Sequence, residues 1–241
     1  MSVLDGEGRV PILYGTQAQP LGRSRDAFIA RPDVGGLHPL IVVAHGPRGV
    51  TSHVKTLCRH LARHGYAAMA PDLYRRPGYP FEDLDAAEAG FAEVITPGAG
   101  ADLAASLALA TRSTTGWAST ERIGLIGLGA GGPAAARIAA EEGAAALVLA
   151  YSPLDGVVES LEGSGVPVLG LFGSDDEIVA VDRVREFAAD ESVEVALYSG
   201  AGHEFLDDGA EGWEPLAAAD AAERMVGFFD ARLTPAVLSA D

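Results

Sequence analysis

Cysteine and lysine are nearly absent from this chain of 241 residues. The single cysteine, Cys58, has no partner for a disulfide within the chain, and the single lysine, Lys55, leaves almost no candidate for Schiff-base chemistry. Lysine and arginine together number 17 against 34 acidic residues, so the net charge is -17 and no basic surface is available to neutralise phosphates or anionic lipid. We therefore expect neither nucleic acid nor a membrane surface as a partner.

Long apolar runs are missing as well. The apolar runs at 40–44 and 144–151 are far shorter than the roughly 20 residues needed to cross a bilayer. The start of the chain, residues 1–7, lacks the basic and apolar regions of a secretion signal, which predicts a cytoplasmic protein. With 48% hydrophobic and 21% charged residues, the composition predicts one domain over residues 1–241.

Short apolar runs alternate with helical patterns from residue 38 onward. Such alternation is typical of βαβ units, and it predicts an α/β fold with a mostly parallel central sheet and helices on both faces. Two closely spaced weaker runs predict an antiparallel hairpin at the sheet edge. The predicted hairpin strands lie at 10–14 and 26–30, and the other strands at 39–44, 66–70, 122–127, 146–151, 166–172 and 193–199.

The predicted helices lie between these strands. One helix carries an apolar stripe at i, i+3, i+4 and i+7, formed by Val54, Leu57, Cys58 and Leu61, and it ends near Gly65. This pattern places Cys58 in the core. Further helices are predicted at 102–111, 134–142, 181–189 and 215–233, with a break at 96–100.

A glycine-rich turn, residues 127–132, follows the predicted central strand and opens the next helix. It matches the dinucleotide pattern GxGxxG, but a Rossmann fold has that turn after its first strand, and several strands precede it here. The turn also has the shape of a nucleophile elbow, G-x-nucleophile-x-G, with Gly129 in the place of the nucleophile. A third interpretation is a tight turn whose glycines only permit close helix packing.

An acid and a histidine follow the next strands in the order that a catalytic triad uses. Asp176 ends the segment Gly-Ser-Asp-Asp at 173–176, and His203 ends Ala-Gly-His at 201–203. In this order Asp176 would fix the tautomer of the His203 ring and raise the basicity of its other nitrogen. The alternative is that Asp176 caps the following helix and His203 is an ordinary loop residue.

Together these segments resemble the dienelactone hydrolase family of the α/β-hydrolase fold, from about residue 38 to residue 230. The most specific stretches are Gly-Tyr-Ala-Ala…Pro-Asp-Leu-Tyr at 65–74 and Ala-Gly-His-x-Phe at 201–205; the segments 39–45, 127–132 and 173–176 add to them. The resemblance implies a Cys-His-Asp triad that opens lactones through an acyl-enzyme.

The chain departs from the family pattern at the residues that would carry this chemistry. The family elbow reads G-x-C-x-G-G, so Gly129 stands where the attacking cysteine would be. The family loop H-E-x-x-G has a glutamate where this chain has Gly46, and Pro47 lacks the N–H that the next residue lends to the oxyanion hole. Of that donor pair only the amide of Ala130 is left.

Several further residues are candidates for the lining of a substrate pocket. Arg76 matches one of the arginines that the family uses to hold a substrate carboxylate, whereas Asp207 stands where another would be, so we do not expect a dienelactone. The loop at 74–81, which begins with Tyr74, either covers the pocket or is a solvated connection. Tyr151 and Ser152 end a strand on the same edge and either line the site or are structural.

The remaining histidines suggest little metal chemistry. His53, His60 and His64 lie along one side of a predicted helix, but the H-E-x-x-H pattern is absent, so we expect exposed histidines beside an apolar stripe and no metal site. His45 is a second acid/base candidate, because it abuts the elbow in the family pattern. His38 is expected at a strand entry.

The sequence thus predicts a cofactor-free enzyme, a monomer or homodimer, that acts on a small molecule. His203 and Asp176 would perform acid/base chemistry without a covalent intermediate: cyclisation, elimination, isomerisation or hydrolysis by an activated water. The alternative is a binding or regulatory protein that kept the pocket and lost turnover, although a buried polar pair is costly to keep without use. Nucleotide binding is the minor alternative.

Overall fold

The computed structural model describes residues 11–18, 26–73 and 116–233, together with Ala87, Phe91 and Ala104. The strands in this part of the chain are β1 Ile12–Ala18, β2 Asp26–Pro32, β3 His38–Ala44, β4 Ala67–Pro71, β5 Ala118–Leu128, β6 Ala146–Ala150, β7 Val168–Gly173 and β8 Val193–Tyr198. The helices are α1 Ser52–Arg63, the 3-10 turn η2 Gly129–Gly131, α4 Gly132–Glu141, α5 Val157–Leu161, α6 Val181–Phe187 and α7 Pro215–Leu233.

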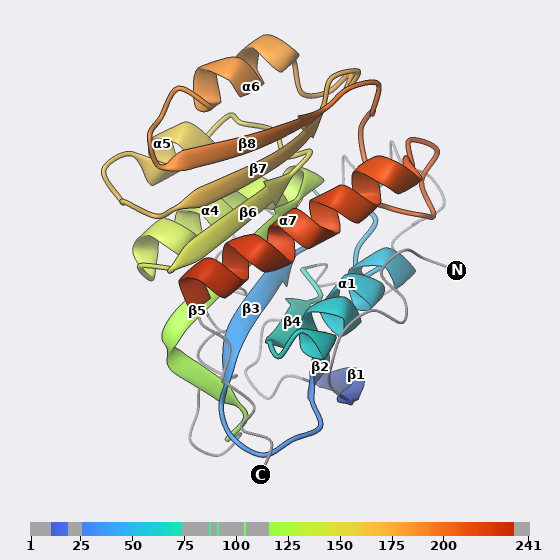
Figure 1. The fold of residues 1–241 in the computed structure, drawn as a ribbon, viewed down its shortest axis with the longest axis vertical. Coiled ribbons are helices and arrows are strands. Elements are labelled where there is room, and N and C mark those ends of the chain that lie inside the picture. Colours follow the sequence, from blue (N-terminus) through green and yellow to red (C-terminus); the bar gives the residue numbers. More distant parts are fainter. Residues whose placement is uncertain are drawn as a thin grey trace.

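The described strands form one sheet of eight, in the order β1-β2-β4-β3-β5-β6-β7-β8 (Figure 1). The six strands from β4 to β8 in this order are parallel to one another, whereas β2 pairs antiparallel with β4 and β1 pairs antiparallel with β2 at one edge. The predicted α/β class and the predicted edge hairpin are therefore confirmed. The strand β1 lies later than predicted, at Ile12–Ala18, because it pairs along the whole of β2.

The other predicted elements match closely, with two differences. The strand β5 begins at Ala118 rather than at residue 122, because its first residues pair with His38 and Pro39 before an irregularity in the register. The short helix α5 was not expected. The predicted helix at 102–111 is described only at Ala104, and the break at 96–100 and the loop at 74–81 lie outside the described residues.

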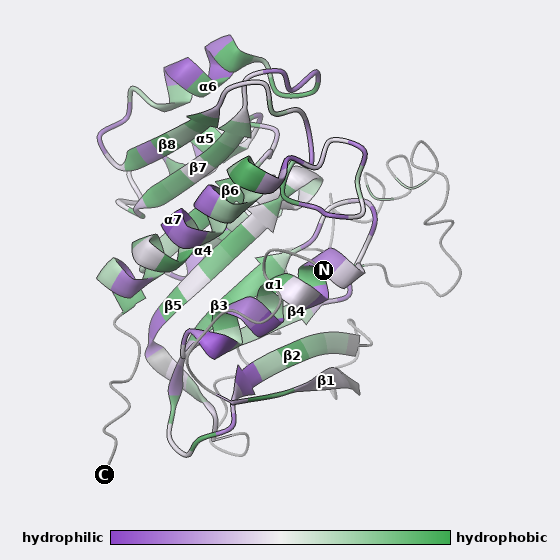
Figure 2. Cartoon of the chain, turned by 45° about the vertical axis from the view of Figure 1, so that its right-hand side comes forward, coloured by the Kyte–Doolittle hydropathy of each residue, from purple (hydrophilic) through white to green (hydrophobic). Residues whose placement is uncertain are grey.

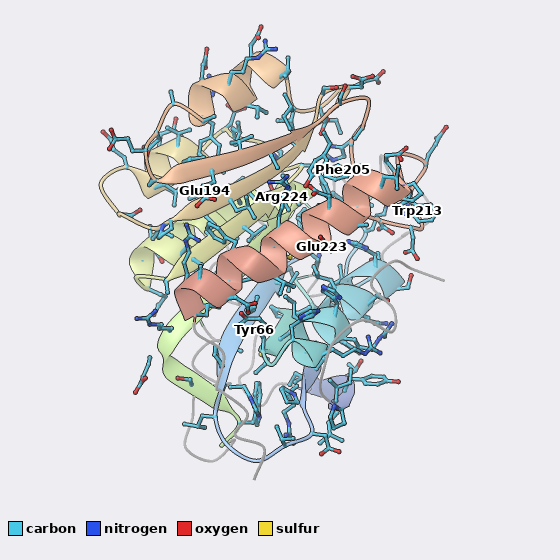
Figure 3. All side chains as sticks on the ribbon, in the orientation of Figure 1. Tyr66, Glu194, Phe205, Trp213, Glu223 and Arg224 are labelled. Atoms are coloured by element: carbon cyan, nitrogen blue, oxygen red, sulfur yellow. The ribbon has the colours of Figure 1, made fainter. Side chains whose placement is uncertain are left out.

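Helices cover both faces of the sheet, with α1 and α7 on one face and α4 and α5 on the other (Figure 1). Every residue of β3, β4, β6 and β7 is buried, and Figure 2 shows these strands as predominantly hydrophobic. Tyr66, labelled in Figure 3, lies beside α7 and donates a hydrogen bond to Asp230, which ties that helix to the sheet. No described helix is both long enough and apolar enough to span a bilayer.

Helix α1 is buried more widely than its apolar stripe indicates. Thr51 caps the helix by accepting a hydrogen bond from the N–H of Val54. Cys58 is fully buried, as predicted. The expectation of exposed histidines is wrong, because His53 and His60 are each only 2% exposed. The burial of most residues of α1, polar ones included, explains the error.

Close packing explains most of the glycines in the turn between β5 and α4. A Cβ at Gly127 would lie 2.5 Å from the Cα of Gly132, and a Cβ at Gly132 would lie 2.3 Å from the hydroxyl oxygen of Ser152. That hydroxyl donates to the carbonyl oxygens of Gly127 and Ala150, so Ser152 is structural. These glycines let α4 and β6 approach β5 closely.

Gly127→Ala should destabilise the protein by about 1–3 kcal/mol or more, because the added methyl group forces α4 away from β5. Urea unfolding followed by circular dichroism measures the change. The matched control is Gly227→Ala on the exposed side of α7, where nothing lies within 4 Å of the new Cβ. That variant should gain about 0.5–1 kcal/mol of stability. Equal unfolding midpoints for the two variants would contradict the packing argument.

Candidate active site

A pocket of about 530 Å³ lies where β3, β5, β6, β7 and β8 end. Because the carboxyl ends of parallel strands meet at one edge of the sheet, loops far apart in the sequence come together there. The size suits a small organic molecule. The lining residues are Gly46, Pro47, Arg48, Gly49, Thr51, His53, Val54, Phe91, Leu128, Gly129, Ala130, Tyr151, Pro153, Ile178, His203, Glu204 and Asp207.

Asp176 and His203 form a hydrogen-bonded pair beside this pocket. His203 Nδ1 lies 2.9 Å from Asp176 Oδ2, and the side chain of Asp176 is completely buried. The other carboxylate oxygen, Oδ1, accepts from the backbone N–H groups of Ile178 and Val179 at 2.8 and 2.9 Å. Since α6 begins only at Val181, Asp176 holds the turn before that helix and does not cap it.

These contacts fix the ionisation of Asp176. Burial raises the pKa of its carboxyl group, but the hydrogen bonds from His203, Val179 and Ile178 together outweigh burial and hold the pKa below its ordinary value. An ionised carboxylate only accepts hydrogen bonds, so Nδ1 of His203 carries the proton. Nε2 of a neutral ring then has a free lone pair, and 24% of the His203 side chain is exposed.

Gly129 lies opposite the free nitrogen of His203. Its φ is +49°, and a Cβ built on it would lie 3.9 Å from His203 Nε2 and 3.7 Å from Tyr151 Cδ2. These are ordinary van der Waals distances, so position 129 has space for a side chain, unlike positions 127 and 132 of the same turn, but the positive φ would strain it. The pocket side of Gly129 is therefore open toward His203.

Tyr151 packs against His203 and adopts an unusual backbone conformation. Its ring meets the His203 ring edge-on, with centroids 5.3 Å apart and planes at 66°. Burial raises the pKa of the Tyr151 phenol well above its ordinary value, with Glu204 and Asp207 adding to the effect. Among the described residues only Tyr151 and Glu204 combine a side chain with a positive φ, and both line the pocket. Such conformations are concentrated at functional sites.

The residues expected at an oxyanion hole also line the pocket. Ala130 belongs to the 3-10 turn that precedes α4, where backbone N–H groups are left without partners inside the helix. Gly46 and Pro47, in the loop after β3, line the same pocket. Since Pro47 has no N–H, the Ala130 amide is the donor available from this pair.

The structure does not bring His45 to the pocket. The ring is fully buried, with Nδ1 2.8 Å from the carbonyl oxygen of Gly46, and Nε2 accepts from the N–H of Leu73 at 2.9 Å. Burial lowers the pKa of His45 to about 4, so the ring is neutral and joins the loops after β3 and β4. His38 begins β3, as expected. Arg76 and Tyr74 lie outside the described residues.

Four polar residues of the pocket were not recognised as a group from the sequence. Arg48 Nε pairs with the Glu204 carboxylate at 3.2 Å, and His53 and Asp207 line the pocket near them. Burial raises the pKa of Glu204, while Arg48 opposes that effect. The usable signal is position: Arg48 and His53 follow β3 closely, and Glu204 and Asp207 follow β8, at the edge where α/β sheets bind ligands.

The α/β-hydrolase fold is defined by a mostly parallel sheet with a strand-turn-helix elbow after its central strand, followed along the chain by an acid and a histidine. Here the acid follows β7 and the histidine follows β8. The family model described as "Dienelactone hydrolase family" matches residues 25–233. The chain therefore belongs to the dienelactone hydrolase family, an enzyme family.

Individual relatives agree with this assignment. A protein of Methylorubrum extorquens named "Putative carboxymethylenebutenolidase" is 32% identical, over 94% of this chain and 81% of its own length. A protein of Salmonella typhimurium with the same name is 31% identical over 86% of this chain and 83% of its own. A solved structure titled "Putative Dienelactone Hydrolase", from Klebsiella pneumoniae, superposes with a TM-score of 0.77 at 30% identity, covering 91% of this chain and 98% of that one.

The stabilising effect of the Asp176 carboxylate should depend on pH. Because its folded-state pKa lies below the unfolded value of about 3.9, the carboxylate stabilises the fold above that value, and the contribution is lost as the pH falls through the folded-state pKa. Asp176→Asn should therefore lower the free energy of unfolding. The difference in this free energy between the variant and the wild type should be largest at pH 7 and should shrink below pH 4. Urea unfolding across this range measures it, with the exposed Asp175→Asn as control. A difference that does not change with pH would refute the argument.

Proposed function

We propose that this protein is an enzyme that performs acid/base chemistry on a small organic substrate without a covalent intermediate. In this proposal His203 transfers the proton, and Asp176 orients the ring of His203. One observation carries the proposal: Nδ1 of His203 is held by Asp176, while Nε2 faces the open space beside Gly129. A water or substrate atom in that space is within reach of the base.

The proposed reaction begins with proton transfer to Nε2 of His203. Hydrolysis by an activated water, elimination, isomerisation and cyclisation all need this step, and the Asp176 carboxylate stabilises the imidazolium that results. When negative charge develops on a substrate oxygen, the Ala130 amide is placed to donate a hydrogen bond to it. Gly129 contributes space and no proton.

The pocket favours a mostly apolar substrate with few charges. Leu128, Phe91, Pro153 and Ile178 supply apolar walls, while Asp207 is unfavourable for a substrate carboxylate on its side of the pocket. Relatives named carboxymethylenebutenolidase make lactones the first class to test, followed by esters and polyketide-like compounds. A protein that binds such a molecule without turnover is the second candidate, since Gly129 has no side chain that could attack.

His203→Ala should lower turnover by about 10² to 10⁴ with the fold intact, because the proton-transfer group is removed. Asp176→Asn should lower turnover less, because it disturbs the tautomer and keeps the ring. Gly129→Ala should act only through shape. Steady-state kinetics on a lactone found by screening gives the order of the three effects. Normal turnover by His203→Ala would show that the dyad is structural, and ligand binding without any turnover in the wild type would favour the binding protein.

The wild type should form no covalent adduct with fluorophosphonate or iodoacetamide reagents. Cys58 is fully buried and burial raises the pKa of its thiol to about 12, so it does not react. Gly129→Cys should gain one iodoacetamide adduct, because its thiol would lie beside His203 Nε2, and adding His203→Ala should slow the labelling. Intact-protein mass spectrometry detects the adducts. A wild-type adduct that requires His203 would restore covalent catalysis.

A further inference from the structure

A second cluster of titratable side chains lies in the same pocket, apart from the His203–Asp176 pair. His53, in the first turn of α1, and Asp207, after β8, both line the pocket, and Asp208 follows directly. One ligand atom from each of these three residues lies within 4.8 Å of the others. Helix α1 and the loop after β8 thus bring an imidazole and two carboxylates to one point.

His53 is buried without a partner. It is 2% exposed, and neither ring nitrogen has a hydrogen bond to any residue that the structure describes. Buried polar groups are almost always hydrogen-bonded, because an unsatisfied one loses its hydration and gains nothing in return. A ring nitrogen of His53 is therefore available to bind a ligand in the pocket.

The two carboxylates beside it also lack a positive partner. Asp207 is 8% exposed, and one of its oxygens accepts from the N–H of Gly209 at 2.8 Å, which fixes the carboxylate. Within the described ranges, neither Asp207 nor Asp208 forms an ion pair, and the nearby Arg48 pairs with Glu204. Adjacent like charges repel each other, so a cation between them would stabilise this part of the pocket.

We propose that His53, Asp207 and Asp208 bind one divalent transition-metal ion, such as Mn²⁺ or Zn²⁺. One imidazole nitrogen with two carboxylate oxygens is a donor set that suits these ions. Each ligand atom sits about 2.0–2.2 Å from such an ion, so two ligand atoms are at most about 4.4 Å apart and the three side chains must draw together to bind it.

The metal would change the chemistry available in the pocket. Three protein ligands leave further coordination positions, where a water or a substrate oxygen can bind. The ion would place positive charge in a region that is otherwise acidic. Metal binding at this cluster does not depend on the catalytic role of His203.

The test is metal binding in the absence of substrate. Protein treated with EDTA should bind one Mn²⁺ or Zn²⁺ per chain in isothermal titration calorimetry, and Zn²⁺ should raise the unfolding temperature. His53→Gln and Asp207→Asn should each weaken binding at least tenfold. Asp208→Asn, on an exposed residue with little effect on folding, should weaken it as well.

Three control variants distinguish binding at this cluster from binding of the ion elsewhere on the acidic surface. His64→Gln, at the end of the same helix, and Glu159→Gln, at an exposed residue of α5, should bind the ion like the wild type. His203→Ala should also keep full affinity, so a failure of the proposed catalysis and a failure of the metal site are distinguishable. Absence of saturable binding, or binding that persists unchanged in Asp207→Asn and Asp208→Asn, would overturn the proposal.

Discussion

The two oxygens of Asp176 connect the parts of the site. One oxygen holds the turn before α6 through two backbone N–H groups, and the other holds the ring of His203, which comes from the loop after the neighbouring strand. The orientation of the imidazole therefore depends on the position of the turn. The free nitrogen of His203 points toward Gly129 only while both sets of hydrogen bonds are kept.

The turn after β5 adopts its conformation with no side chain at position 129. A side chain at φ +49° would be strained, and glycine adopts that conformation without strain. The neighbouring glycines, Gly127 and Gly132, are required by close packing of β5, α4 and β6. The shape of the turn is thus maintained by packing, independently of any chemistry at position 129.

The fold was largely predictable because its elements depend on local patterns. Apolar runs of strand length, separated by helical stripes, determine a parallel sheet, and the sheet brings residues after different strands to one edge. For this reason the order of Gly129, Asp176 and His203 along the sequence was enough to place them together. The hairpin of β1 and β2 followed from the same kind of pattern.

The remaining features depend on contacts between distant segments. The periodicity of α1 placed His53, His60 and His64 on one side of a helix, but their burial depends on what covers that side. The family motif predicted that His45 lies beside the elbow, but it could not predict the direction of the ring. In the structure the ring contacts the backbone of Gly46 and Leu73. No local pattern pairs Arg48 with Glu204, since the two loops meet only in the folded chain.

The burial of Cys58 has a consequence for the redox behaviour of the protein. Enzymes with a thiolate nucleophile lose activity when peroxide converts the thiolate to a sulfenic or sulfinic acid. This chain has one thiol, which is protonated and enclosed by the core. Met69 and Met225 are enclosed as well. The described lining of the pocket therefore contains no cysteine or methionine that peroxide could oxidise.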